Sequence, residues 1–235
     1  MLLVLAAATG CTAVVNGSVR PAPGLSPRPL TGRSVQQVLL DPAELSRVFG
    51  QSFAADPNSP PESGPGALHV NVFSPPECGG VANVLIKDSY AGSDVRDVAG
   101  ERWWNSAPDE QHPPVISVHE AVVALPSARA ADARFAALAK QWRGCNGRST
   151  TIGGDVNFTF KISHVQEKDS LVAANVDDAS TYMTVPGARA VGVRVNCIIE
   201  VEVVFFSRRT DDGARHTPSA ADVARLMMDR VSSLS

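Results

Sequence analysis

Cys11 is the residue whose surroundings point most directly to a chemical modification. It ends an apolar run over residues 1–10 that finishes in small side chains. A bacterial lipobox has this form: the chain is cut before the cysteine, and acyl chains are attached to its thiol and its new amino group. We therefore expect a signal peptide and lipobox over residues 1–11, lipid attachment at Cys11, and an extracytoplasmic protein held at the cell membrane.

The leader departs from the usual pattern at two points. The first basic residue is Arg20, whereas a secretory signal opens with a basic segment, and Ala8 stands where a lipobox usually has leucine. Either the true start lies upstream or Met1 is an internal methionine. An ordinary cleaved leader and a ragged apolar N-terminus are the alternatives to lipidation. The run is shorter than the roughly 20 apolar residues that cross a bilayer, and we expect a soluble mature body.

The other cysteines differ in their surroundings. Cys78 and Cys145 lie in polar, glycine-flanked settings at the ends of expected elements, whereas Cys197 sits inside an apolar run. In an oxidising compartment two of the three are expected to pair. We predict a disulfide between Cys78 and Cys145 and a buried thiol at Cys197.

The remaining candidates for chemistry are scattered along the chain. The 5 histidines form no i, i+4 pair, and the sequence has neither a Cys-x-x-Cys motif nor a Gly-x-Ser-x-Gly elbow. Asp177-Asp178 and Asp211-Asp212 are adjacent carboxylates that we expect to be solvated. We therefore predict no catalytic residue, no metal site and no cofactor. A hydrolase would need a serine or aspartate paired with one of two histidines, His119 or His164.

Aromatic pairs offer a different chemistry. Trp103-Trp104, beside Glu101 and Arg102, could line a cleft and stack on a sugar or lipid. The alternative is that one indole fills the core and the other covers it. Phe205-Phe206, followed by Arg208-Arg209, could edge a groove, although core packing of one phenylalanine is the simpler interpretation.

Composition limits the class of protein. The chain has 235 residues, 44% hydrophobic and 19% charged, with a net charge of -3. This suits one globular domain once the leader and a tether are removed. Because acidic and basic residues are interspersed and no basic stripe is present, a nucleic-acid partner is not expected.

The elements that must position these residues follow from periodicity and capping. Proline and glycine over residues 12–34 predict a flexible spacer, with an ordered N-terminal arm as the alternative, and residues 54–66 are predicted to form a loop. Helices are predicted over 41–50, 78–89, 127–145 and from a Thr217 cap to the C-terminus. Strands are predicted over 69–73, 94–104, 115–125, 157–165, 170–176 and 190–206, the last being two strands or one long bent strand.

Two of these helices show an apolar stripe at helical spacing, comprising Ala131, Phe135, Leu138 and Trp142 in one, and Val223, Leu226, Met227 and Val231 in the other. Helices combined with consecutive strands indicate an α+β fold in which helices flank a mostly antiparallel sheet.

Several motifs in order resemble a known family. Pro76-Glu77-Cys78 precedes a helix that runs into Tyr90-Ala91-Gly92-Ser93, and a Pro126-Ser127 helix start leads to Trp142-Arg143-Gly144-Cys145-Asn146-Gly147. Over residues 35–234 this resembles the PknH-like extracellular sensor domain, also found in freestanding mycobacterial lipoproteins. The resemblance implies a central antiparallel sheet with flanking helices, a deep V-shaped cleft for an extracellular ligand, and a Cys78–Cys145 pair.

The resemblance also marks what this chain lacks. A second cystine of the family falls near Gly187 and Val204, neither of which is a cysteine, so we expect that crosslink to be lost. The glycine loop, lysine strand and catalytic loop of a kinase are not found in the sequence.

These observations favour a non-catalytic, lipid-anchored sensor or ligand-binding domain over residues 35–235. Its cleft would take a small molecule, glycan or lipid fragment from outside the cell, and its contact with the membrane would be the lipid anchor. The alternative is an interaction module that docks onto another protein of the cell envelope.

Overall fold

A computed structural model describes residues 27–106, 114–153, 157–180, 183–207 and 218–235. Their strands form one sheet in the order β1-β4-β5-β11-β10-β8-β7-β6-β3, with β2 paired to β4 and β9 to β8. Every pairing between named strands is antiparallel, so the mostly antiparallel α+β fold is confirmed.

The strands are β1 (Phe53–Ala55), β2 (Glu62–Ser63), β3 (Phe73–Ser74), β4 (Asp97–Asn105), β5 (Val115–Ala124), β6 (Ser149–Ile152), β7 (Phe158–Lys168), β8 (Leu171–Ala179), β9 (Thr184–Val185), β10 (Gly187–Arg194) and β11 (Cys197–Phe205). The helices are α1 (Arg33–Gln36), α2 (Pro42–Phe49), α3 (Gly79–Ala82), α4 (Ala128–Cys145) and α5 (Ala220–Leu234), with 3₁₀ turns η1 (Pro65–Ala67), η2 (Pro76–Cys78) and η3 (Lys87–Tyr90).

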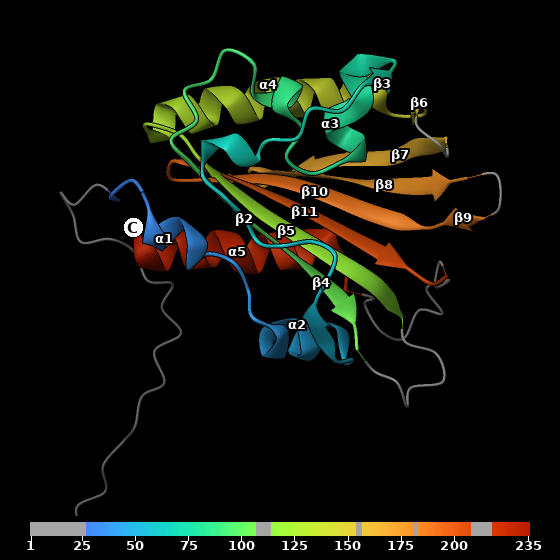
Figure 1. Cartoon of the computed structure of the whole chain (residues 1–235). Coiled ribbons are helices and arrows are strands. Elements are labelled where there is room, and N and C mark those ends of the chain that lie inside the picture. Colours follow the sequence, from blue (N-terminus) through green and yellow to red (C-terminus); the bar gives the residue numbers. More distant parts are fainter. Residues whose placement is uncertain (1–26, 107–113, 154–156, 181–182, 208–217) are drawn as a thin grey trace, which may run out of the picture.

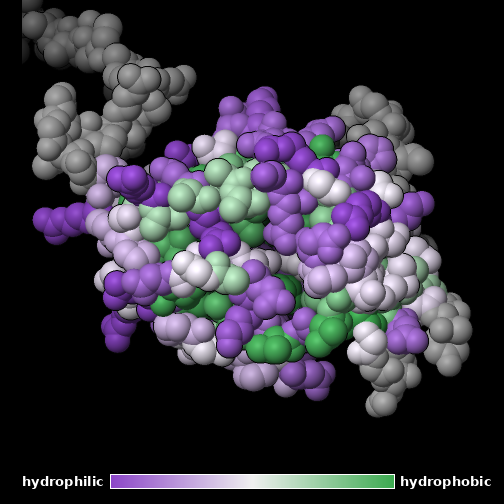
Figure 2. Space-filling model, turned by 90° about the horizontal axis from the view of Figure 1, so that it is seen from above, coloured by the Kyte–Doolittle hydropathy of each residue, from purple (hydrophilic) through white to green (hydrophobic). Residues whose placement is uncertain are grey.

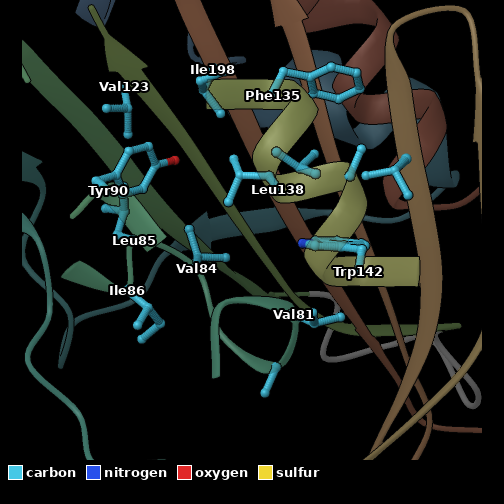
Figure 3. Packing of buried hydrophobic residues seen from close by; sticks show 14 of the residues in the cluster. Val81, Val84, Leu85, Ile86, Tyr90, Val123, Phe135, Leu138, Trp142 and Ile198 are labelled. Atoms are coloured by element: carbon cyan, nitrogen blue, oxygen red, sulfur yellow. The ribbon is translucent and has the colours of Figure 1, made fainter. Parts of the chain in front are cut away.

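The sheet has a hydrophobic core on each face. In Figure 1, α3 and α4 lie above the sheet, whereas α1, α2 and α5 lie below it. The predicted stripe of α4 is buried, and Phe135, Leu138 and Trp142 pack toward the segment from Val81 to Tyr90 and toward β5 and β11 (Figure 3). The opposite core joins the N-terminal helices to α5 and the sheet. Two covered faces explain why the central strands carry almost continuous apolar runs.

Helix α2 begins and ends where its capping residues predict. The Asp41 carboxylate accepts a hydrogen bond from the Glu44 backbone N–H, Pro42 occupies the first turn, and Gly50 closes the helix in the left-handed conformation. Likewise Ser127 caps α4. Residues 190–206 resolve into two strands, β10 and β11, joined at Val195 and Asn196.

The expected spacer ends earlier than predicted. Leu30 is 2% exposed in the lower core, and α1 begins at Arg33. The buried amide of Asn196 holds this segment because its oxygen accepts from the Leu30 N–H at 2.7 Å and its nitrogen donates to the Leu30 carbonyl at 3.0 Å. The folded domain therefore includes residues 30–34, which the sequence had assigned to the spacer.

The single helix predicted over 78–89 is wrong. The segment is broken into η2, α3 and η3, and Leu85 adopts a left-handed φ of 58°. The buried guanidinium of Arg189 binds carbonyl groups that a continuing helix would use for its own ladder. These are the carbonyls of Gly80, Val81 and Asn83.

Three smaller predictions also need correction. The loop over 54–66 contains parts of two short strands, because β1 and β2 pair with β4 on either side of the prolines at 57, 60 and 61. The strand over 69–73 is reduced to a bridge at His69 and the start of β3, and its valines are exposed.

The last helix starts at Ala220 rather than after Thr217, which lies outside the described residues. Ser219 and Asp222 form a capping box there. Leu226 is 44% exposed instead of buried, because it falls away from the stripe formed by Val223, Met227 and Val231.

Candidate ligand pocket beside Trp103

A pocket of about 400 Å³ opens beside β4, between β2 and the turn that joins α1 to α2. Strand alternation directs Ala99, Glu101 and Trp103 to one face of β4, and all three line it. The other lining residues are Gln36, Leu39, Leu40, Asp41, Pro61, Glu62, Ser63 and Gly100. The volume lies in the range of small-molecule sites.

The charged residues that line this pocket are all acidic: Asp41, Glu62 and Glu101. Asp41 is engaged in capping α2. Glu101 has no hydrogen bond or ion pair to any other residue that the structure describes. Partial burial, and secondarily the charge of Glu62, raise the pKa of Glu101. Among the described residues, the carboxyl group of Glu101 therefore has no counter-charge.

Trp103 is fixed in place by a buried acid. Its indole Nε1 donates to Glu120 Oε1 at 2.8 Å, and the Leu40 N–H donates to Glu120 Oε2 at 3.1 Å. Glu120 is fully buried, and burial raises its pKa to about 8 despite these two donors. This contact ties the indole to both β5 and the α1–α2 turn, so one wall of the pocket is held from two directions.

Glu62 lies between two histidines. Its Oε1 is 2.6 Å from His69 Nε2 and its Oε2 is 2.9 Å from His119 Nε2. Burial alone would raise the pKa of Glu62, but the hydrogen bonds from His119 and His69 outweigh it and lower that pKa to about 2. The hydrogen bond with Glu62 raises the pKa of His69.

A glycine makes room for this arrangement. Gly100 pairs with Glu62 across β2 and β4, and a Cβ at position 100 would collide with the Glu62 carboxylate. Arg102 continues the network by reaching His119 Nδ1 at 3.0 Å. The network therefore fastens β2, which borders the pocket, to β4 and β5.

A separate buried network lies under α3. Arg189 is fully buried and donates to Glu200 Oε2 at 3.0 Å, while the Tyr90 hydroxyl donates to Glu200 Oε1 at 2.6 Å. The guanidinium also lies 5.8 Å from the Trp142 ring. Each of these groups contacts the protein on several sides, so the network is structural.

A second pocket of about 440 Å³ lies near the start of α5. Its lining includes the basic residues Lys168, Arg189 and Arg225, together with His164 and the acid Asp222. Arg225 lies 3.5 Å from Asp222, which itself caps α5. The charge of Arg225 is thus partly compensated within this pocket, whereas Glu101 in the pocket beside Trp103 has no such partner among the described residues.

The two tryptophans of the Trp103-Trp104 pair lie on opposite faces of the sheet. Trp103 is half-buried at the pocket, whereas Trp104 points to the opposite face and is 47% exposed. Phe205 packs against the lower core and Phe206 is 54% exposed. Sequence reasoning therefore identified one pocket residue, Trp103, but assigned no role to Glu62 or Glu120. An acid interrupting the apolar run of β5 was the available signal for Glu120.

Neither of the two histidines that a hydrolase would need is placed as a catalytic base. His119 is occupied by Glu62 and Arg102. His164 Nδ1 lies 3.1 Å from Ser163 Oγ and 3.4 Å from Asn175 Nδ2, and both contacts use the same ring nitrogen. A base that relays between a nucleophile and an orienting group needs both nitrogens. Across the described residues no group of three or more His, Cys, Asp or Glu could hold a metal ion.

The structure pairs Cys78 with Cys145, as expected, and Cys197 is a fully buried free thiol. Burial raises the pKa of Cys197 to about 12. Asp178 is partly buried, and its pKa is raised to about 6 by burial and by Glu202. The remaining predicted residues, Cys11, His112, Arg208, Arg209, Asp211, Asp212 and His216, lie outside the described residues.

Comparison with known proteins identifies the family of this chain. Residues 30–230 match the family model described as the PknH-like extracellular domain. The chain belongs to this family. The match includes Leu30, in agreement with its burial in the lower core.

Related sequences and a solved structure agree with this assignment. The serine/threonine-protein kinase PknH of Mycobacterium tuberculosis strain H37Rv is 27% identical over 223 residues, covering 91% of this chain and 32% of the kinase. PknH of Mycobacterium bovis is 27% identical over 244 residues, covering 97% of this chain and 37% of the kinase. The chain therefore spans about a third of the length of these relatives.

The crystal structure of the extracellular domain of PknH from Mycobacterium tuberculosis superposes with a TM-score of 0.72 at 20% identity, covering 88% of this chain and all of that domain. The family shares this fold, and the similarity is to the extracellular domain of the kinase. No helix in the described ranges is long and apolar enough to cross a membrane.

Proposed function

We propose that this protein is a non-catalytic, lipid-anchored sensor domain on the outer side of the cell membrane. It would bind a small molecule, glycan or lipid fragment in the pocket beside Trp103. Membership of the PknH-like extracellular domain family supports the extracytoplasmic location and the non-catalytic role. The observation that supports ligand binding most strongly is a concave pocket with an indole wall and an unbalanced carboxyl group.

Ligand capture tests the proposed binding. The purified protein is incubated with an extract of bacterial envelope, recovered, and examined by native mass spectrometry for retained molecules. The matched control is Ser63→Trp, which places a bulky ring at the mouth of the pocket on an exposed strand position. We expect a retained mass that Ser63→Trp loses while its circular dichroism spectrum is unchanged. Equal retention by the blocked variant would place binding elsewhere, and reproducible absence of any retained molecule would contradict ligand binding.

The lipid anchor at Cys11 needs its own test. Cells grown with an alkyne-tagged palmitate should label the protein, and Cys11→Ala should abolish the label and release the protein from the membrane fraction. An unlabelled wild-type protein in the cytosol would contradict both the anchor and the location.

An interaction module is the second candidate, and one observation favours it. Val70 and Val72 are 77% and 84% exposed on the segment between η1 and β3. Seen from the α4 side, the surface is a mosaic of hydrophilic and hydrophobic residues (Figure 2). In crosslinked cells, a stoichiometric protein partner that is lost in the Val70→Asp, Val72→Asp double variant would favour this function over small-molecule binding.

A further inference from the structure

We propose that the pocket beside Trp103 selects an organic cation, an ammonium or guanidinium group carried on an apolar body. Glu101 would be its counter-charge, and the Trp103 indole would pack beside it. This inference rests on the proposed function, because it names the class of ligand for the same pocket.

The register of the sheet creates an unusual charge at this point. Glu101 on β4 and Glu120 on β5 are direct cross-strand partners, so their side chains leave the same face of the sheet. Because burial raises the pKa of Glu120 to about 8, this acid is mostly protonated at neutral pH, which leaves Glu101 as the member of the pair that can carry a negative charge. Glu120 is buried and receives two hydrogen bonds, whereas Glu101 receives none from the described part of the chain. A positive group bound at Glu101 would balance the charge of that side chain.

The basic side chains near this pocket are engaged elsewhere. Arg102, His69 and His119 form the network around Glu62, and Arg102 alternates with Glu101 and thus projects from the opposite face of β4.

Arg230 of α5 lowers the pKa of Glu120 but forms an ion pair with Glu44 and donates to the Leu39 carbonyl. No lysine, arginine or histidine lines the pocket. Because the described part of the chain supplies no partner for Glu101, we assign the positive charge to a ligand.

The remaining walls suit the body of such a ligand. Leu39, Leu40 and Ala99 are apolar, and Trp103 contributes an aromatic ring. Aromatic faces attract cations as well as apolar groups, and a tryptophan ring does so most strongly. An anion would meet the three carboxyl groups of Asp41, Glu62 and Glu101, and the two histidines that contact Glu62 do not line the pocket. The pocket near α5, which contains Lys168 and Arg225, has the opposite character.

Three probes of matched shape test the charge preference. Phenethylamine, 2-phenylethanol and phenylacetate share a phenyl body and carry a positive, no and a negative charge, respectively. Each is titrated against the protein at low salt while the indole N–H signals are followed by NMR. We expect saturable shifts of the Trp103 signal with phenethylamine, and at least about tenfold weaker binding of the two other probes, as for loss of one charge-assisted contact.

Glu101→Gln keeps the shape of the side chain and removes its charge, and we expect it to weaken phenethylamine binding about tenfold. The control is Asp132→Asn, which removes the same charge from the exposed side of α4. It should leave the affinity unchanged.

Two results would overturn the inference: equal affinity of Glu101→Gln and wild type for phenethylamine, or binding of the neutral or anionic probe as tight as that of the amine. If phenethylamine does not bind, but the protein retains a neutral or anionic envelope molecule that Ser63→Trp loses, the proposed ligand binding is supported and the preference for a cation is wrong. If no probe and no envelope molecule binds, both proposals fall.

Discussion

Single ionisable side chains determine how this domain responds to pH. Glu62 is ionised to about pH 2 because two histidines donate to it, and His69 holds its proton above the ordinary histidine range because Glu62 accepts from it. The stabilisation from Glu62 is complete above its unfolded pKa of about 4.5 and is lost as the pH falls toward 2. The stabilisation from His69 is complete below pH 6.5 and is lost as the pH rises through its raised pKa.

Replacing Glu62 tests this pairing directly. In Glu62→Gln the pKa of His69 should fall toward the ordinary value of about 6.5, because the carboxylate that holds its proton is gone. NMR titration of the imidazole C–H signals measures this pKa. Asp132→Asn serves as the control and should leave His69 unchanged. An unaltered His69 pKa in Glu62→Gln would mean that the contact in the structure does not persist in solution.

Glu120 makes the opposite contribution. Its pKa is raised to about 8 by burial, so between its unfolded value and pH 8 the folded state holds a proton that the unfolded state releases. This group therefore lowers stability as pH rises over that interval, by at most about 1.4 kcal/mol per pH unit. In Glu120→Gln this slope should be absent from urea unfolding measured between pH 5 and 8. The same slope in both proteins would assign it to another group.

At the level of elements, hydrogen bonds from Arg189 take the place of helical hydrogen bonds in the segment 78–89. Its guanidinium binds three backbone carbonyls of the 78–89 segment, which allows that segment to turn sharply and still bury Val81, Val84 and Leu85 against α4. The central strands β10 and β11 supply both Arg189 and its partner Glu200, so the segment is organised by the middle of the sheet.

The same strand pair leaves no room for a crosslink between positions 187 and 204. Gly187 and Val204 are direct partners across β10 and β11. A Cβ at Gly187 would lie 2.5 Å from the Val176 carbonyl oxygen, which is backbone and cannot move aside cheaply. The backbone approach at position 187 is therefore one that only glycine permits.

Two alanine substitutions test the crowding at Gly187. Gly187→Ala should lower the free energy of unfolding by about 1–3 kcal/mol, because the added methyl group overlaps the neighbouring strand. Gly144→Ala is the matched control: it lies in the last turn of α4, where a Cβ meets nothing within 4 Å, and should raise stability by up to about 1 kcal/mol. Chemical unfolding measures both. Equal effects of the two substitutions would contradict the close approach at Gly187.

At the scale of the whole molecule, the disulfide joins two segments of the upper layer. Cys78 ends η2 and Cys145 ends α4, and both are buried in the upper core. The bond closes a sequence separation of 67 residues. Chain entropy gives it a contribution of about 4 kcal/mol at most, a large part of the stability of a domain.

Removing both cysteines should therefore lower the melting temperature markedly. Reducing agent provides the internal control: it should lower the melting temperature of the wild type toward that of Cys78→Ser, Cys145→Ser and leave the double variant unchanged. A wild type insensitive to reductant and as stable as the double variant would show that the bond does not form or does not stabilise the fold.

Local signals were sufficient for much of this molecule. The caps at Asp41 and Ser127, the apolar stripe of α4 and the settings of Cys78 and Cys145 are short-range features, and they predicted α2, α4, most strands and the disulfide. Trp103 was singled out as an aromatic candidate because its neighbours along the chain are charged.

Tertiary structure alone decided the rest. The broken 78–89 segment depends on Arg189, and the buried N-terminal segment depends on Asn196, residues that are distant in sequence. The pocket likewise combines β4 with β2 and the α1–α2 turn, and the register of the sheet places Glu101 opposite the buried Glu120 rather than opposite a basic residue. Periodicity reports which face of an element is buried, but it does not report which residue of another element lies against it.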